Sequence, residues 1–510
     1  MKKFTKILCP ILFSVTAMLT ISCSDDDDNG NNGNNNGSTT GPDLVFYGLS
    51  KTNSLVQYNA NNTNTPLSTQ AITGLAAGES IKAIDFRPAT GQLYGLSSLS
   101  RIYVINHQTA VARAIGTTAF TPALAGDLAG FDFNPTVDRI RVVTSSGQNL
   151  RVHPETGVVA FTDGNLNPGS PVVGSAAYTN SAAGASSTAL YVIDFASGNL
   201  HKQDPPNDGK LTAVGSLTTT VTAGADGGFD ISPDNSVALA SFTESGSSKL
   251  FTIDTNTGKA TNIGNLSVEL IGLAIPTSPV AYAVDSANNL QIFNFQTPGT
   301  PVSKPIANLS SGENIVGIDL RPANGALYGL GSEGRLYKID LGSGTATQIG
   351  VAPVALLLGT SFGFDFNPLV DRIRIVSNTG QNLRVNPNDG TLAAADGTLN
   401  PGSPAVTAAA YTNNFAGTTT TTLFTIDTAA DALFKQDPPN DGTLISVGNL
   451  GFDAVENNGF DIGGISNIGY AVLTTGTASK IYSVNTTTGA ATAVADFPNA
   501  VRGFAVGLGF

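Results

Sequence analysis

Aspartate and arginine residues recur at fixed spacing in this chain, and their side chains are the first to consider for chemistry. In the stretch Phe131-Asp132-Phe133, alternation along a strand places Asp132 on the face opposite the two aromatic rings. Arg139 and Arg141 share one face of the next stretch in the same way. Carboxylates and guanidinium groups gathered like this can bind an anionic or hydroxyl-rich ligand, or they can pair with one another.

The candidate ligand-binding residues occur twice. In the first half they are Asp85, Arg87, Asp132, Asp138, Arg139, Arg141 and Arg151, with Gln148 and Asn149 beside them. In the second half they are Asp319, Arg321, Asp365, Asp371, Arg372, Arg374 and Arg384, with Gln381 and Asn382. The competing interpretation, which the sequence favours, is a lattice of ion pairs between neighbouring elements, because buried charges must be paired.

A second candidate site is a loop that also occurs twice, at residues 202–209 and 435–442. Its carboxylate and amide oxygens suit Ca²⁺, the only cofactor considered; the candidate ligands are Asp204, Asn207, Asp208, Asp437, Asn440 and Asp441. Pro-Pro and Asn-Asp-Gly are equally turn-forming sequences, and a plain turn is the preferred interpretation. The stretch Asp163-Gly164-Asn165 invites the same two interpretations.

Signatures of catalysis are scarce. Asn386 and Phe434 stand in the second half where the first half has His153 and His201, so no histidine-based site is duplicated. The chain has no GxSxG elbow, no HExxH motif and no phosphate-binding GxxxxGK[ST] loop. The sequence therefore favours a protein that is not an enzyme. Paired carboxylates doing acid–base work keep a hydrolase or lyase open as the alternative.

These residues are positioned by an internal duplication. Residues 131–152 match residues 364–385 at 17 of 22 positions, an offset of 233. The sequence predicts two copies, at 44–276 and 277–510, with Pro276-Thr277-Ser278-Pro279 as the boundary.

A finer period of about 46 residues runs inside each copy, marked by an apolar–Asp–apolar–x–Pro unit with Asp at 85, 132 and 230. Each unit carries four short alternating stretches with glycine turns, the pattern of a β-propeller blade. We expect an all-β fold of two tandem five-bladed propellers, in which residues 271–275 and 502–506 return to close each ring. One ten-bladed ring and tandem β-sandwiches remain alternatives.

The N-terminus indicates export and a lipid anchor. A basic start and an apolar run of about 15 residues precede Cys23, which predicts a signal peptide at 1–22 and lipidation of Cys23. Residues 23–43 read as a flexible Asp/Asn/Gly tether. The segment Ser24 to Asp28 resembles the acidic run of surface lipoproteins of Bacteroidota. We therefore expect an outer-membrane lipoprotein exposed at the cell surface, with a periplasm-facing orientation as the alternative.

Composition excludes several classes of protein. The net charge of −13 disfavours a nucleic-acid partner. Two cysteines and three histidines rule out disulfide scaffolds and zinc modules. Charged residues make up 12% of the chain, about half the usual share, which suits short strands and many turns.

The Phe-Asp-Phe-Asn-Pro and Asp-Arg-Ile-Arg stretches, together with residues 147–151 and 176–180, make both halves similar to a bacterial family, domain of unknown function 4394. The resemblance implies a propeller-like β fold outside the cytoplasm and no established activity. The sequence thus predicts a surface binding or scaffold module whose partner is a glycan or a protein.

Overall fold

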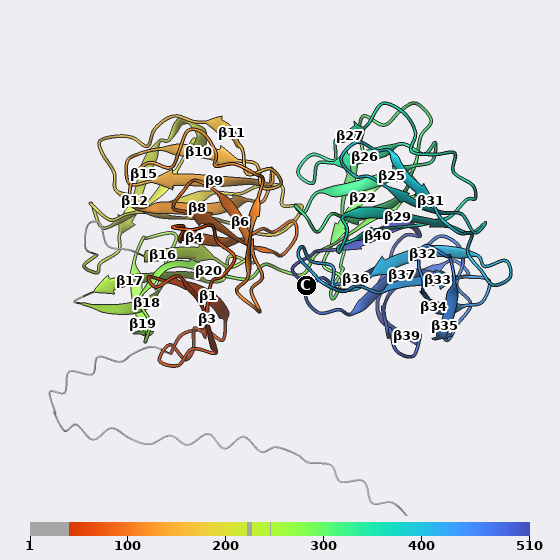
Figure 1. Cartoon of the computed structure of the whole chain (residues 1–510). Coiled ribbons are helices and arrows are strands. Elements are labelled where there is room, and N and C mark those ends of the chain that lie inside the picture. The colour runs from red at the N-terminus through yellow and green to blue at the C-terminus, as the bar shows by residue number, and fades with distance from the viewer. Residues whose placement is uncertain (1–39, 222–226, 245) are drawn as a thin grey trace, which may run out of the picture. The chain divides into compact units, whose positions relative to one another are not determined.

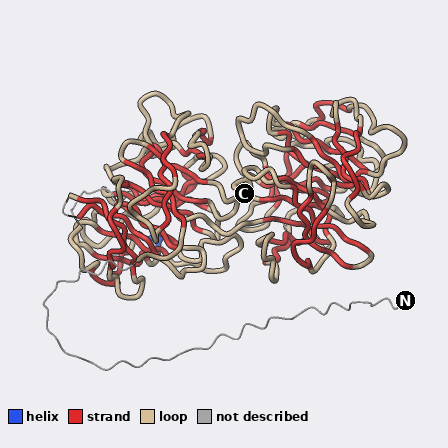
Figure 2. The backbone as a smooth tube through the Cα atoms, turned by 90° about the horizontal axis from the view of Figure 1, so that it is seen from below, coloured by secondary structure: helices blue, strands red, loops and turns tan. Residues whose placement is uncertain are grey.

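The computed structural model describes residues 40–221, 227–244 and 246–510 (Figure 1). Residues 39–510 form one compact unit. The predicted signal peptide, Cys23 and most of the predicted tether lie outside the described residues. The described part consists of strands and loops with one short 3-10 turn, η1 (Pro206–Asp208), as Figure 2 shows. No helix in that part is long and apolar enough to span a membrane.

The strands of the described residues pair into ten antiparallel sheets of four, and the first half contributes five. Written from the innermost strand outward, these sheets are β20 (Leu270–Ala274), β1 (Val45–Ser50), β2 (Ser54–Asn59), β3 (Ser68–Ala71); β4 (Ile81–Phe86), β5 (Leu93–Ser97), β6 (Ile102–Ile105), β7 (Ala112–Ile115); β8 (Ala129–Asn134), β9 (Arg139–Thr144), β10 (Asn149–Val152), β11 (Val159–Thr162); β12 (Val173–Tyr178), β13 (Leu190–Asp194), β14 (Asn199–Gln203), β15 (Leu211–Ser216); β16 (Gly227–Ile231), β17 (Ala238–Glu244), β18 (Ser247–Ile253), β19 (Ala260–Asn265).

The second half repeats this arrangement. Its sheets are β40 (Val501–Val506), β21 (Ala281–Asp285), β22 (Asn289–Phe293), β23 (Val302–Pro305); β24 (Ile315–Leu320), β25 (Leu327–Gly331), β26 (Leu336–Ile339), β27 (Ala346–Ile349); β28 (Phe362–Asn367), β29 (Arg372–Ser377), β30 (Asn382–Val385), β31 (Leu392–Ala395); β32 (Val406–Tyr411), β33 (Leu423–Asp427), β34 (Ala432–Gln436), β35 (Leu444–Asn449); β36 (Gly459–Ile462), β37 (Gly469–Thr475), β38 (Ala478–Val484), β39 (Ala491–Phe497).

Each half closes on itself. Strand β20 pairs with β1 at Ala274 and Tyr47, and β40 pairs with β21 at Val506 and Ala281. The innermost strands β4, β8, β12, β16 and β20 contact one another in a cycle, as do β24, β28, β32, β36 and β40. The prediction of two five-bladed propellers, each closed by its last strand, is confirmed. The ten-bladed ring and the tandem sandwiches are wrong, because each closing strand returns to its own half.

The hydrophobic core of each propeller lies between adjacent blades. Every residue of β5 is buried, whereas Phe161 in the outermost strand β11 is exposed. Tyr94 of one blade packs edge-on against Phe133 of the next, with ring centroids 5.1 Å apart. Because both faces of the inner strands are covered, these strands read as apolar runs in the sequence.

Glycine on the innermost strands lets neighbouring blades approach closely. A Cβ added at Gly130 of β8 would lie 2.8 Å from the Cβ of Ala176 and from the carbonyl carbon of Ser175, both in β12. Gly272 of β20 occupies the position that corresponds to Gly130 of β8. A Cβ added at Gly272 would lie 3.4 Å from its nearest neighbour, the Cβ of Leu49. Close approach at Gly130 therefore depends on the missing side chain.

We predict that Gly130→Ala lowers the free energy of unfolding by about 1–3 kcal/mol, because two packed inner strands must separate. Gly272→Ala is the matched control, since its added methyl group meets only an ordinary contact and reduces the freedom of the unfolded chain. Thermal and denaturant unfolding of both variants tests this. Equal stabilities for the two variants would contradict the close-packing argument.

Candidate functional site

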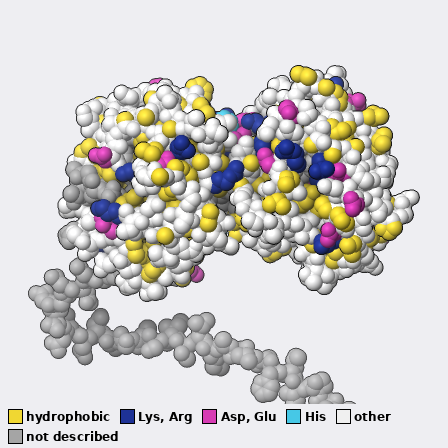
Figure 3. Space-filling model, in the orientation of Figure 1, with side chains coloured by type: hydrophobic (Ala, Val, Ile, Leu, Met, Phe, Trp, Pro, Cys, Tyr) yellow, Lys and Arg dark blue, Asp and Glu magenta, His cyan; other side chains and the backbone are white. Residues whose placement is uncertain are grey.

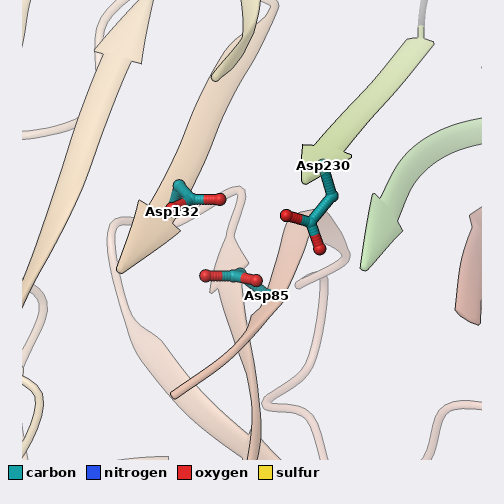
Figure 4. Close-up of side chains that lie close together, drawn as sticks. All are labelled: Asp85, Asp132 and Asp230. Carbon is teal, nitrogen blue, oxygen red and sulfur yellow. The ribbon is translucent and has the colours of Figure 1, made fainter. Parts of the chain in front are cut away.

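Three buried aspartates converge at the centre of each propeller. In the first, Asp85 of β4, Asp132 of β8 and Asp230 of β16 point toward one another, as Figure 4 shows. Each offers a carboxylate oxygen within 4.8 Å of the others, and each is at most 3% exposed. The second propeller repeats the group. Its members are Asp319, Asp365 and Asp461.

The carboxylates bind backbone N–H groups at the ends of the innermost strands. In the first propeller, Asp85 accepts from Phe86 (2.7 Å) and Phe133 (2.8 Å), Asp132 from Tyr178 (3.1 Å), and Asp230 from Ile231 (2.6 Å) and Ile275 (2.6 Å). These five donors come one from each blade. Since the innermost strands do not pair with one another, their N–H groups at the centre need side-chain acceptors. The aspartates therefore join the five blades at the axis.

Two blades lack the aspartate, and the remaining ones compensate. Ala177 and Ala274 occupy the corresponding positions of β12 and β20. Each aspartate binds an N–H group of the next blade, so the innermost strand that follows an alanine blade receives no carboxylate from that blade. Asp230 and Asp85 therefore use their second oxygen for the N–H of the following residue in their own strand. Three carboxylates thus serve five strands.

The second propeller satisfies its five strands in the same pattern. Asp319 accepts from Leu320 (2.7 Å) and Phe366 (2.7 Å), Asp365 from Tyr411 (2.9 Å), and Asp461 from Ile462 (2.6 Å) and Val506 (2.6 Å). Because the two halves share the pattern down to the donor positions, the aspartates explain why the Asp period recurs in the sequence.

Burial and mutual repulsion hold these carboxyls partly protonated. Burial raises the pKa of Asp230 and that of Asp461 to about 7. Burial, followed by the negative charge of a neighbouring aspartate, raises the pKa of Asp85 and Asp132 well above the usual range, although backbone N–H groups pull it down. The group therefore carries less than its full negative charge at neutral pH.

Three converging carboxylates invite comparison with a cation site, and their surroundings argue against it. Ca²⁺ needs six to eight oxygen ligands, whereas five of the six carboxylate oxygens of each group already accept a backbone N–H. The nearby central cavity, lined by Ala83, Gly130, Ser175 and Gly228 among others, has a volume of about 10 Å³. That space holds about one water molecule.

Arg87 joins the blade of β4–β7 to the blade of β8–β11. This fully buried guanidinium donates from Nε and Nη2 to the carboxylate of Asp138, at 2.9 and 2.5 Å, and from Nη2 to Glu155 at 3.3 Å. Burial acts to lower the pKa of Arg87, but Asp138 more than offsets this, so the pKa is raised. In the second propeller Arg321 binds Asp371 in the same way.

Arg141 joins the blade of β8–β11 to the blade of β12–β15. It donates to Asp163 (2.6 Å), to Asn149 (2.7 Å) and to Asn207 of the neighbouring blade (2.8 Å). Arg151 forms two bonds to the same Asp163, each 2.8 Å long. Arg374, Arg384 and their partners repeat this network in the second propeller.

The predicted ligand-binding residues thus form separate networks rather than one cluster. The structure brings Asp85 and Asp132 together, but the arginines lie in other networks. Arg139 and its counterpart Arg372 both donate to the backbone carbonyl of the preceding aspartate, and Arg139 also approaches Asp340 at 3.4 Å. Most of these side chains bind other residues of the chain. Ligand binding by them stays a prediction, and the observed pairs have the geometry expected of a lattice.

The candidate calcium loop is occupied by a protein cation. Asn207 accepts from the Arg141 guanidinium, exposed Asp204 pairs with Lys202 at 3.1 Å, and Asp208 is exposed at the end of η1. In the second loop Asn440 accepts from Arg374 in the same way. Calcium binding stays a prediction, and the guanidinium beside the loop is unfavourable for it.

One serine, one histidine and one aspartate meet in the blade of β12–β15 without the geometry of a triad. Ser197 donates to Asp194 at 2.7 Å, and the same histidine nitrogen, Nε2 of His201, lies 3.5 Å from Ser197 and 4.0 Å from Asp194. A catalytic triad instead needs the aspartate on Nδ1 and the serine on Nε2. Nδ1 of His201 is buried without a hydrogen bond in the described structure.

Sequence reasoning missed some members of these networks. Asp230 and Asp461 complete the central groups. The sequence did indicate Asp230, because it occupies the same position in the repeated unit as Asp85 and Asp132. Asp163 is the acceptor for two arginines, although its sequence suggested only a turn or a calcium loop. Glu155 carried no signal, because Asn388 replaces it in the second half.

The closed rings and the central aspartates define this chain as a tandem pair of five-bladed β-propellers. The model of the family described as a domain of unknown function, DUF4394, matches residues 54–274 and 289–505. The chain belongs to that family. No curated protein matches it.

Two solved structures are similar at low identity. The Dos1 propeller is 14% identical, with a TM-score of 0.26 over 64% of this chain and 83% of that one. PorZ, a surface component of the type-IX secretion system of Porphyromonas gingivalis, is 14% identical, with a TM-score of 0.25. The match covers 88% of this chain and 64% of PorZ, which is less than two thirds of the length of PorZ. Because these TM-scores are low, the assignment of the fold is based on the strand pairing of this chain alone.

We predict that neutralising the central group changes how stability depends on pH. Because burial and the charge of Asp85 raise the folded-state pKa of Asp132 well above its unfolded-state value, Asp132 binds more protons when folded, so the free energy of unfolding falls as pH rises between the two pKa values. Asp132→Asn keeps an oxygen for the Tyr178 N–H and removes the charge. We expect the variant to lose less stability than the wild type between pH ~5 and pH ~8.

Thermal melting across that range measures the effect. Asp127→Asn, at an exposed position, is the control and should follow the wild type. A melting temperature of Asp132→Asn that falls with pH as steeply as that of the wild type would show that the carboxyl is ionised throughout.

Proposed function

We propose that this chain is a binding or scaffold module, tethered by a lipid at Cys23 to the outer membrane and exposed at the cell surface. Its ligand would be a glycan or a protein that contacts the loops at the edge of a propeller. The N-terminal signal supports the address, and the contrast between buried and exposed residues of the two copies supports the role.

The observation behind this role is an exposed loop that differs between the two copies, although the copies share the central aspartates and the networks of Arg141 and Arg374. Between β27 and β28 the second copy exposes Val351, Leu356 and Leu358 at 102%, 81% and 52%. The corresponding residues of the first copy, also exposed, are Thr117, Ala123 and Ala125. Large apolar side chains gathered in water are typical of interaction surfaces.

The apolar loop is held in a defined conformation. Gln381 donates from Nε2 to the carbonyl of Leu356 and accepts from the N–H of Leu358, both at 2.9 Å. A surface that is already ordered loses less conformational entropy when a partner binds. Hydrophobic side chains are scattered elsewhere over the face shown in Figure 3. The loop brings three large exposed apolar side chains together within residues 351–358.

The central carboxylates offer little support for the alternative of a channel hydrolase or lyase. The nearby central cavities have volumes of about 10 Å³ in both propellers, so a substrate has no space to enter there. The carboxylates are also occupied by backbone donors. The loops are therefore the more suitable place for function.

We predict that mass spectrometry of the mature protein finds an acylated Cys23 at the N-terminus. Cys23→Ala should release the protein from the membrane fraction, because a lipid chain supplies the membrane affinity. Protease treatment of intact cells should degrade the wild-type protein. An unmodified Cys23 would remove the anchor, and full protection from protease would place the chain in the periplasm.

We predict that a photo-crosslinking residue at position 356 in intact cells gives a discrete crosslinked product, whereas the matched position 123 of the first copy does not. Replacing Val351 by Thr and Leu358 by Ala, the residues of the first copy, should reduce that product at least about tenfold, since loss of even one buried apolar side chain, about 1.5–3 kcal/mol, corresponds to a tenfold or larger change in affinity. Equal crosslinking at positions 356 and 123 would contradict the proposal.

A further inference from the structure

A mainly apolar cavity of about 420 Å³ lies inside the compact unit of residues 39–510, away from the central aspartates. Its floor is formed by the blade of β5, β6 and β7 through residues such as Leu93, Ile105 and Val111. Ala323, Phe415 and Leu508 of the second half cover it. The volume falls in the range of small-molecule sites, roughly 300–1,000 Å³.

Among the described residues that line this cavity, the permanent charge is positive and belongs to Arg113. Arg113 lines it and donates from Nη1 to the carbonyl of Ala323 at 3.0 Å. No Asp or Glu is among the described lining residues, although the protein as a whole is acidic. Arg113 as a whole is exposed, but partial burial of its guanidinium lowers its pKa; Asp371 raises the pKa and the positive charge of Arg321 lowers it. A bound anion would relieve this cost.

Several neutral polar side chains line the cavity with Arg113, among them His107 and Gln92. The ring of His107 packs edge-on against Tyr47 and Phe86, at 5.6 and 5.8 Å between centroids. Burial lowers the pKa of His107, so its imidazole is neutral at neutral pH and offers one donor and one acceptor. Gln92 also lines the cavity, is 8% exposed, and has an Oε1 without a hydrogen-bond partner in the described structure.

Comparison of the two copies supports a role for Arg113 and His107 in the cavity. In the second half, Thr347 and Leu341 occupy the positions of Arg113 and His107, and Leu341 is buried in a hydrophobic cluster. Arg113 and His107 are therefore not needed to build a blade of this type. Their presence in the copy that has the cavity indicates a role for the cavity itself.

We propose that this cavity binds a small amphipathic carboxylate, with its hydrocarbon body against the apolar wall and its carboxylate on Arg113. A guanidinium and a carboxylate form charge-assisted hydrogen bonds, and apolar contact supplies most of the remaining affinity. This site is independent of the loop between β27 and β28, so either can fail without the other.

Isothermal titration of sodium octanoate into the full chain tests the site, with Cys23→Ala in every sample so that no lipid anchor adds a second apolar site. We expect saturable binding at one site. Arg113→Gln should weaken octanoate about tenfold, or about 1.4 kcal/mol, and leave the neutral probe octan-1-ol unchanged. Ala416→Trp, which fills the cavity, should abolish binding of both probes.

Arg101→Gln is the matched control, because Arg101 lies on the same blade, pairs with Glu79 and does not line the cavity. It should bind octanoate as the wild type does. Absence of saturable octanoate binding, or binding that survives Ala416→Trp, would overturn the site. Equal affinity of wild type and Arg113→Gln for octanoate would overturn the role of Arg113 and with it the choice of an anionic ligand.

Discussion

The structure depends on how five innermost strands that do not pair with one another satisfy their backbone N–H groups at the centre of a ring. A buried N–H without a partner costs about 1–3 kcal/mol, and each propeller presents one such group per blade at the same level. Three aspartates accept all five. Carboxylates suit this task because each has two oxygens, so one side chain can bind its own strand and the next. Asp85 and Asp230 do this, which is why two blades manage with alanine.

The same demand limits what the centre can do. Burial raises the pKa values of these carboxyls, and the charge of a neighbouring aspartate within 4.8 Å raises those of Asp85 and Asp132 further. They hold protons and backbone donors, with space for about one water molecule in the cavity beside them. Arg87 and Arg141 carry the linkage outward from blade to blade through Asp138 and Asp163. Because the interior side chains join neighbouring blades, the two copies differ in loops such as residues 351–358 and in the residues that line the cavity beside Arg113.

Much of the fold could be predicted from the sequence. The Asp period near 46 residues gave the number of blades, and residues 271–275 and 502–506 were expected to close the rings, as β20 and β40 do. The candidate site was predicted less well. Asp85 and Asp132 were grouped with arginines that belong to other networks, and Asp230, Asp163 and Glu155 were left out. Sequence spacing shows which residues share a strand face, but not which oxygen meets which donor on a neighbouring blade.

The sequence by itself determined the duplication, the all-β class and the five units per copy, because each of these follows from the local pattern of residues and its period. Tertiary structure alone decided whether the chain makes one ring or two, since that depends on which edge the last strand of each half pairs with. It also decided that Asn207 meets Arg141, and that Arg113 and His107 line a cavity covered by Phe415. Such contacts join residues far apart in the chain, and only closure of the blades brings them together.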